Sequence, residues 1–134
     1  MSVVEFKLKN HKKYNKKILF VFFEENTNLT NSDEVDKIIE EYFKIIAENP
    51  EIHIIVDSTN VKSIPLKLVM SKVSKFKGND ALLKKNIKSF AVIIKNFIFR
   101  SIFNTVAELG LFHAPHIMTD NDKVALNFVV EHLK

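Results

Sequence analysis

The chain has 134 residues, of which 46% are hydrophobic and 27% are charged, and its formal net charge is +4 at pH 7. This length and composition are those of a globular protein with a substantial buried core, and they exclude a disordered chain. The absence of cysteine excludes disulfides, cysteine nucleophiles and thiolate metal sites. We expect a single domain over residues 1–134.

The positive charge is concentrated in the second half of the chain. Between Lys62 and Arg100 there are ten basic residues and one acidic residue, Asp80. Such a segment could contact an anionic membrane surface or an acidic partner, but it is more typical of solvated lysines in a lysine-rich composition. Nucleic-acid recognition usually relies on arginine, and Arg100 is the only arginine in the sequence, so a nucleic-acid partner is not expected.

No apolar run is long enough to cross a membrane, since the longest ones have the length of strands. The first residues also lack the order of basic, apolar and small residues that forms a signal peptide. We therefore expect a cytoplasmic protein without a transmembrane segment.

The first half of the chain predicts a hairpin, a helix and a buried strand. Residues 3–9 alternate between apolar and polar side chains, and residues 18–25 form a fuller strand after a polar turn. A helix begins at Asn31 or Ser32, has acidic residues in its first turn, and ends at Asn49-Pro50. The continuous apolar run at residues 52–57 indicates a strand that is buried on both faces.

The second half alternates helices with strands. Residues 65–76 predict a helix with lysines off its apolar stripe, and residues 80–86 add one or two further helical turns. The apolar stripe of that first helix comprises Leu66, Val69, Met70, Val73 and Phe76, and the lysines off it are Lys67, Lys72 and Lys75. Three more elements and a last helix follow: a strand at 87–95, a helix at 96–110, a strand at 114–120 and a helix at 121–134.

The predicted order of elements is β-β-α-β-α-β-α-β-α, which defines an α/β fold. Alternating units of this kind form a mostly parallel central sheet with right-handed crossovers and helices packed on it. The N-terminal hairpin adds one antiparallel strand to this sheet.

This order, together with two local stretches, resembles the STAS domain, the anti-sigma-factor-antagonist fold, and its SpoIIAA-like relatives with Sec14-type similarity. The stretches are IIVDSTNVKSIPLKLV at residues 54–69 and MTDNDKVALNFVVEHL at residues 118–133. The resemblance implies that Asp57, Val61 and Ile64 keep the family's register. In that register the family's phosphorylated serine falls on Lys67, so the resemblance also implies that the phospho-switch is absent.

The loop after the strand at 52–57 is the first candidate site. Its polar members are Asp57, Ser58, Thr59, Asn60, Ser63 and Lys67. Working residues often lie at the carboxyl ends of strands in α/β folds, although Asp, Ser and Thr also stabilise ordinary turns. Because no nucleophile elbow or catalytic triad is present, we expect a protein that is not an enzyme.

No cofactor or metal is predicted either. No glycine-rich phosphate loop follows any strand. His113 and His116 are close in sequence but lack a clear third ligand, and His53 fits a packed core histidine.

The helix at 96–110 carries more large apolar residues than one narrow stripe can hold, and it supplies the candidate interface: Phe97, Ile98, Phe99, Ile102 and Phe103. Two functions remain open. The first is a non-catalytic, STAS-like interaction or regulatory module that binds a protein partner or forms a homodimer. The second is a protein that binds a lipid or a small apolar ligand and uses its basic surface for anionic headgroups. An apolar cavity beneath residues 65–103 would favour the second function over the first.

Overall fold

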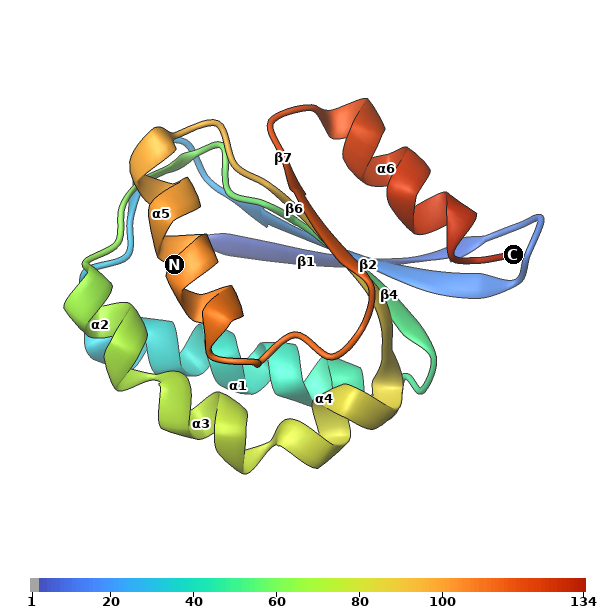
Figure 1. Cartoon of the computed structure of the whole chain (residues 1–134), viewed down its shortest axis with the longest axis horizontal. Helices are drawn as coiled ribbons and strands as arrows, with labels where there is room; N and C mark the ends of the chain where they lie inside the picture. The colour runs from blue at the N-terminus through green and yellow to red at the C-terminus, as the bar shows by residue number, and fades with distance from the viewer. Residues whose placement is uncertain (1–2) are drawn as a thin grey trace.

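The structure is a computed structural model that describes residues 3–134. The five strands of its main sheet are β1 (Val4–His11), β2 (Lys16–Phe23), β4 (Ile52–Asp57), β6 (Ile87–Ile93) and β7 (His116–Thr119). They lie in the order β1-β2-β4-β6-β7 (Figure 1). β1 pairs with β2 in antiparallel orientation and every other pair is parallel. The predicted α/β fold, with a mostly parallel sheet and one antiparallel N-terminal strand, is confirmed.

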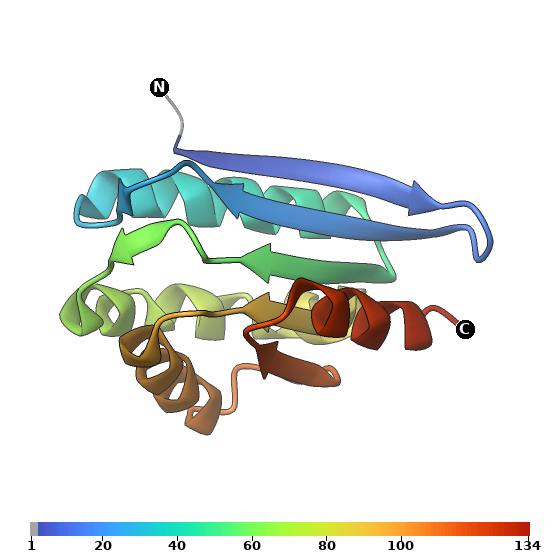
Figure 2. The ribbon, with the colours of Figure 1, turned by 90° about the horizontal axis from the view of Figure 1, so that it is seen from above.

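Helices cover the two faces of this sheet unequally. The helices are α1 (Ser32–Glu48), α2 (Leu66–Ser71), α3 (Val73–Gly78), α4 (Asp80–Asn86), α5 (Phe97–Glu108) and α6 (Asp122–Glu131). The first five lie on one side of the sheet, and α6 lies alone on the other (Figure 1). Seen from above, α6 lies over β6 and β7 and leaves most of β1 and β2 uncovered on its side (Figure 2), although it also contacts β4 and packs against Ile18 near the start of β2. Within residues 3–134, no helix combines the length and hydrophobicity that a membrane crossing needs.

Asparagine side chains fix the starts of three helices. The side-chain oxygen of Asn31 accepts a hydrogen bond from the Glu34 N–H at 3.0 Å. Asn96 and Asn121 cap α5 and α6 in the same way. Because the first turn of a helix has N–H groups without intrahelical partners, these caps determine where each helix begins.

The alternation of side chains along the buried strands divides the core into two clusters. On β4, Ile54 packs with the α1 side and Ile55 with the α6 side. Four side chains of the α1-side cluster are fully buried: Leu19, Ile46, Ile52 and Ile54. The predicted burial of the strand at 52–57 on both faces therefore holds for its first four residues, 52–55.

The predicted helix at 65–76 is broken at Lys72, and its apolar stripe is partly wrong. Lys72 ends α2 and precedes α3, and its N–H bonds back to the Val69 carbonyl at 3.0 Å. Leu66 and Met70 were expected to face the core but are 47% and 39% exposed, while Lys72 is only 7% exposed. A single stripe assumes one uninterrupted helix, and the break rotates the two halves relative to that stripe.

A second, two-stranded sheet was not predicted. It pairs β3 (Thr27–Asn28) with β5 (Val61–Ser63) in parallel. Both strands are too short to produce a periodic pattern in the sequence. The pairing joins the segment after β2 to the segment after β4, and it holds Val61 in the core on the α1 side.

Candidate functional site

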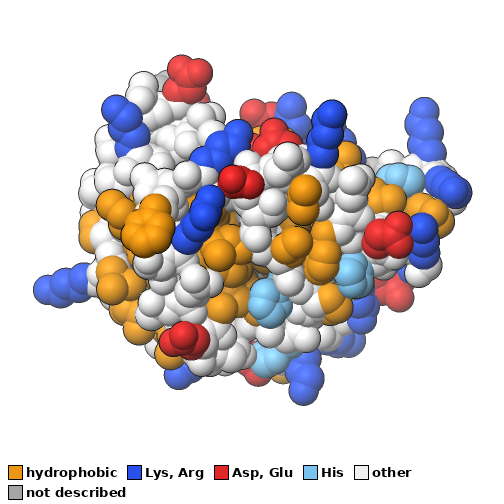
Figure 3. Space-filling view, turned by 45° about the horizontal axis from the view of Figure 1, so that its top comes forward, with side chains coloured by type: hydrophobic (Ala, Val, Ile, Leu, Met, Phe, Trp, Pro, Cys, Tyr) orange, Lys and Arg blue, Asp and Glu red, His pale blue; other side chains and the backbone are white. Residues whose placement is uncertain are grey.

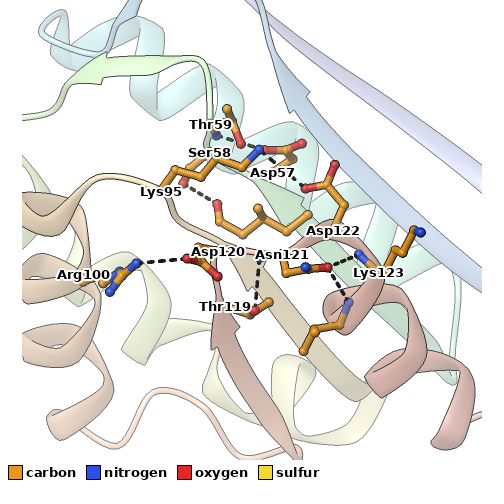
Figure 4. Close-up of polar contacts among 12 residues, drawn as sticks. Asp57, Ser58, Thr59, Lys95, Arg100, Thr119, Asp120, Asn121, Asp122 and Lys123 are labelled. Atoms are coloured by element: carbon orange, nitrogen blue, oxygen red, sulfur yellow. Dashed lines mark hydrogen bonds and ion pairs between the residues drawn. The ribbon is translucent and has the colours of Figure 1, made fainter.

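The loop that follows β4 is held by its own polar side chains. The Asp57 carboxylate accepts a hydrogen bond from the Thr59 N–H at 2.9 Å, and the Ser58 hydroxyl donates to the Ile93 carbonyl at 2.7 Å (Figure 4). Further along the loop, the Asn60 side-chain amide donates to the Phe23 carbonyl at 3.0 Å, and the Ser63 hydroxyl donates to the Asn28 side-chain oxygen at 2.7 Å. These bonds tie the loop to the ends of neighbouring strands, which is a structural role.

Charged residues surround this loop without forming a reactive cluster. Lys95, after β6, lies 3.9 Å from Asp122 at the start of α6 (Figure 4). Arg100 on α5 lies 3.6 Å from Asp120 in the turn after β7. Over residues 3–134, no group of three His, Asp or Glu side chains is arranged to hold a metal ion. Lys67 is exposed on α2 and takes no part in these contacts.

An apolar cavity of about 360 Å³ lies between the α1 side of the sheet and the helices that cover it. The sheet contributes Phe23, Val56, Phe90 and Val92, and the helices contribute Val35, Ile39, Val69, Phe76 and Leu83, among others. Figure 3 shows hydrophobic side chains in a hollow between α5 and the segment around β7. Ser58 is the one residue of the predicted loop site that lines this cavity.

The predicted interface on α5 is divided between the cavity and the surface. Phe99 is 8% exposed, and it lines the cavity together with Ile102 and Phe103. Phe97 and Ile98 are 77% and 65% exposed, so only these two of the five predicted residues lie on the outer surface of the helix. The high density of apolar residues on α5 therefore results from two separate faces, one directed to the cavity and one to solvent.

A lysine and a tyrosine, Lys72 and Tyr42, are among the residues that line this apolar cavity. The Lys72 ammonium donates to the Ser32 hydroxyl at 2.6 Å and lies 2.8 Å from the Asp36 carboxylate, both on α1. The hydrogen bond from Lys72 is the main cause that lowers the pKa of the Asp36 carboxyl, and Lys75 adds to it from 3.5 Å. Tyr42 lines the same cavity, and burial raises the pKa of its hydroxyl above the usual value.

The two neighbouring histidines point to different partners. The His113 ring contacts the Asp80 carboxylate, while the His116 ring nitrogen lies 3.0 Å from the Ala114 carbonyl oxygen. His116 also packs against Phe112, whose ring centroid lies 5.3 Å away. His113 lines the cavity, whereas His116 reaches it only indirectly, through its contact with the cavity residue Phe112.

The basic segment at residues 62–100 is partly neutralised in the fold. Four of its ten cations lie in ion pairs with aspartates, namely Lys72, Lys75, Lys95 and Arg100. The others include Lys62, Lys67, Lys77 and Lys84, which are exposed. The positive charge that residues 62–100 offer to an anionic surface is therefore smaller than the count of ten basic residues indicates.

Sequence reasoning missed Lys72 and Tyr42 as cavity residues. Tyr42 belongs to the apolar face of α1, so nothing in the sequence separates it from an ordinary core residue. Lys72 was expected on the solvent side, and only the break between α2 and α3 brings it to the wall. Its burial depends on Ser32 and Asp36, which are distant in sequence.

The sequence matches no protein-family model and no curated protein. Among solved structures, the chain is similar to an uncharacterised protein of the DUF3478 family from Shewanella loihica PV-4, which has a SpoIIAA-like fold. The two share 12% sequence identity with a TM-score of 0.59, and the similarity covers 96% of this chain and 95% of that one. The element order, the mixed sheet and this similarity over nearly the full length together show that the chain has a SpoIIAA-like fold.

Proposed function

We propose that this chain binds a small apolar ligand, such as a single lipid chain, in the cavity on the α1 side of the sheet. The observation that carries this proposal is the cavity of about 360 Å³ with an almost wholly hydrocarbon lining. An engineered apolar cavity of about 150 Å³ stays dry and binds benzene, and natural ligand sites have volumes of roughly 300–1,000 Å³. The cavity is thus large enough for a ligand and too apolar for ordered water to fill it well.

The proposed role is non-catalytic. The polar loop after β4 uses its side chains to hold neighbouring strands, and Asp57 does not line the cavity. A bound ligand would contact mainly Phe, Ile and Val side chains, which supply affinity by burial and no reactive group. The Lys67 side chain stands where the resemblance places a phosphorylated serine, which agrees with a role that needs no phospho-switch.

Replacing Ile102 by tryptophan is expected to fill the cavity and to lower the affinity for an uncharged apolar probe by about tenfold or more. The probe is N-phenyl-1-naphthylamine, whose fluorescence increases in apolar surroundings. Ile98→Trp is the matched control, because it makes the same change on the same helix at a side chain that is 65% exposed. Equal binding by wild type and Ile102→Trp would contradict the proposal. Val106→Phe, a smaller increase at another cavity residue, serves if Ile102→Trp does not fold.

Exposed aromatic and aliphatic side chains at the start of α5 favour a second function, self-association through this surface. Phe97 and Ile98 are adjacent and have the largest exposed fractions among the large apolar side chains of residues 3–134. Exposed apolar residues that lie together are typical of protein interaction sites. We propose them as the contact of a homodimer, which would be compatible with ligand binding because the cavity uses the other face of α5.

The double substitution Phe97→Ser/Ile98→Ser is expected to raise the dissociation constant of the dimer by about tenfold or more. Sedimentation equilibrium measures this constant. Val124→Ser/Leu126→Ser on α6 is the control, since these side chains are 43% and 42% exposed but lie on a different element. A wild-type protein that remains monomeric up to millimolar concentration would rule out this interface.

A further inference from the structure

The β1–β2 hairpin carries the most concentrated positive charge in the chain. Residues 7–17 contain six lysines and no acidic residue. The hairpin extends past the ends of the other strands (Figure 1), and blue side chains project from the same, right-hand end of the molecule in Figure 3. Lys7 and Lys16 are each paired with a glutamate, at 3.1 Å and 3.6 Å, and Lys17 donates to an asparagine side chain. Three lysines of the hairpin have no acidic partner within residues 3–134: Lys9, Lys12 and Lys13.

The α6 side of this hairpin is an open sheet face, because α6 leaves most of β1 and β2 uncovered (Figure 2). Phe20 packs at the margin of the core cluster on the α6 side, and Phe22 points to the same side because strand side chains alternate. The rings of Phe20 and Phe22 are nearly parallel, with an interplanar angle of 3° and centroids 6.1 Å apart. Phe22 is 36% exposed. Two aromatic rings therefore lie next to each other on a face that no helix covers.

A lysine of β1 lies over each of these two rings. The Lys9 ammonium is 5.3 Å from the centroid of the Phe20 ring, and the Lys7 ammonium is 6.0 Å from the centroid of the Phe22 ring. Since the cation in such a contact lies over the ring face, the faces of both rings are directed toward exposed lysine side chains. A long exposed lysine side chain can move aside. A flat ligand group can then stack on the ring while the ammonium stays close to it.

We infer that the open face of the β1–β2 hairpin binds single-stranded nucleic acid, with bases stacked on Phe20 and Phe22 and phosphates bound by Lys9, Lys12 and Lys13. Proteins that bind single strands combine aromatic side chains, often on a sheet, with a positively charged path for the backbone. The scarcity of arginine argues against reading of base edges, but stacking and phosphate contacts need only ring faces and cations. This inference does not depend on the cavity, which lies on the other side of the sheet.

Other anionic partners fit this face less well. Binding to a membrane interface buries protruding apolar side chains among the lipids, whereas the rings of Phe20 and Phe22 lie beneath lysines. An acidic peptide would pair with the lysines but would leave both ring faces unused. A second copy of the chain would bring the same positive charge to the contact and would be repelled.

The test measures the fluorescence anisotropy of three dodecamers with the same end label: oligo(dT), oligo(U) and an abasic chain of equal charge. The wild-type protein is expected to bind the better of the first two at least tenfold more tightly than the abasic chain, because only bases can stack. The better of the two identifies DNA or RNA as the source of the strand. Three phosphate contacts predict a slope of about −2 for log K against log salt concentration.

Substitution of the two rings tests the stacking. Phe20→Leu/Phe22→Leu keeps an apolar face but removes the aromatic rings, so it should weaken binding of the better oligonucleotide about tenfold and leave the abasic chain unchanged. Phe6→Leu is the matched control, because it makes the same change in the hairpin at a side chain that packs on the α1 side. If the double variant does not fold, Phe22→Leu alone should weaken binding about fivefold, at a side chain that is 36% exposed.

Substitution of two adjacent lysines tests the phosphate contacts. Lys12→Gln/Lys13→Gln should weaken binding about tenfold or more and reduce the salt slope to about −0.7, the value for one remaining contact. Lys84→Gln/Lys85→Gln is the control, because it removes two exposed charges from α4, on the other side of the sheet. This control should change the affinity less than about twofold.

Several results would overturn the inference. One is equal binding of the abasic chain and both oligonucleotides, and another is a Phe20→Leu/Phe22→Leu protein that binds as tightly as wild type. Oligoglutamate or phosphatidylserine vesicles serve as the competing anions. If either binds more tightly than both oligonucleotides, the face belongs to an acidic protein or a membrane instead. All these results leave the cavity site standing, since binding of N-phenyl-1-naphthylamine tests that site separately.

Discussion

Replacing Ile54 by alanine is expected to lower the free energy of unfolding by about 4 kcal/mol, whereas Ile102→Ala should lower it by only about 1–2 kcal/mol. Both changes delete the same atoms. Ile54 is 0% exposed in the centre of β4 and packs in the sealed part of the core, so its loss leaves a new void. Ile102 already faces the cavity on one side and has fewer protein atoms to lose contact with. The difference between the two variants thus reports whether the cavity exists in the free protein.

Urea unfolding followed by circular dichroism at pH 7.5 measures both values. Ile98→Ala, measured at a protein concentration at which the wild type is monomeric, is the control for the intrinsic effect of the substitution in α5, and it is expected to change stability by less than about 0.5 kcal/mol because Ile98 is 65% exposed. If Ile102→Ala is as costly as Ile54→Ala, the helix α5 packs tightly on the sheet in solution. That result would also count against a ligand-binding role, since a well-packed core leaves no room for a ligand.

Local patterns predicted those elements whose sequence carries an unambiguous signal. The strand at residues 52–57 was found with its boundaries because it is a continuous apolar run between a helix-ending Asn49-Pro50 and a polar loop. The starts of α1 and α5 followed from asparagine caps, which act through bonds within three residues. In both cases the information that determines the structure lies within a few neighbouring residues.

The cavity could not be predicted, because it depends on distances between elements. An apolar residue such as Phe103 or Val106 has the same helical spacing whether it fills a core or lines a void. What creates the cavity is the position of α5 relative to the sheet, and this depends on tertiary packing such as the contact between the Phe103 and Phe112 rings, whose centroids lie 5.0 Å apart. The candidate binding loop was accordingly placed at Asp57, where only Ser58 reaches the cavity, and the three cavity residues of the candidate interface, Phe99, Ile102 and Phe103, were not distinguished from its exposed members.

Lys72 shows a second limit of local reasoning. Lysine is normally exposed, so a buried lysine requires partners that the sequence does not reveal. Here those partners are Ser32 and Asp36, about forty residues earlier in the chain. The break between α2 and α3 at Lys72 coincides with this ion pair, which is a tertiary interaction that overrides the helical propensity of the segment.

Acidification from pH 7.5 to pH 5.0 is expected to lower the stability of the wild-type protein through His53. This residue is 2% exposed between β2 and β6, and its Nδ1 lies 2.7 Å from the Ser89 hydroxyl oxygen. Burial, followed by the charges of Lys16 and His132, lowers its pKa from 6.5 to about 4. The unfolded chain therefore binds a proton at a higher pH than the folded protein. Stability is full above about pH 6.5 and falls as the pH decreases toward 4, by about 3 kcal/mol in all.

About 2 kcal/mol of this loss should occur between pH 7.5 and pH 5.0, before most carboxylates titrate, which makes it measurable by urea unfolding at these two pH values. His53→Asn is the matched variant, because its amide can keep the hydrogen bond to Ser89 but does not titrate. It should be less stable than wild type at pH 7.5, owing to lost packing, and should lose much less stability on acidification. The four other histidines are unchanged in the variant, so their contribution cancels in the comparison. An equal pH dependence in the two proteins would show that protonation of His53 does not lower the free energy of unfolding. Water would then have to reach the His53 ring on the α6 side of the sheet.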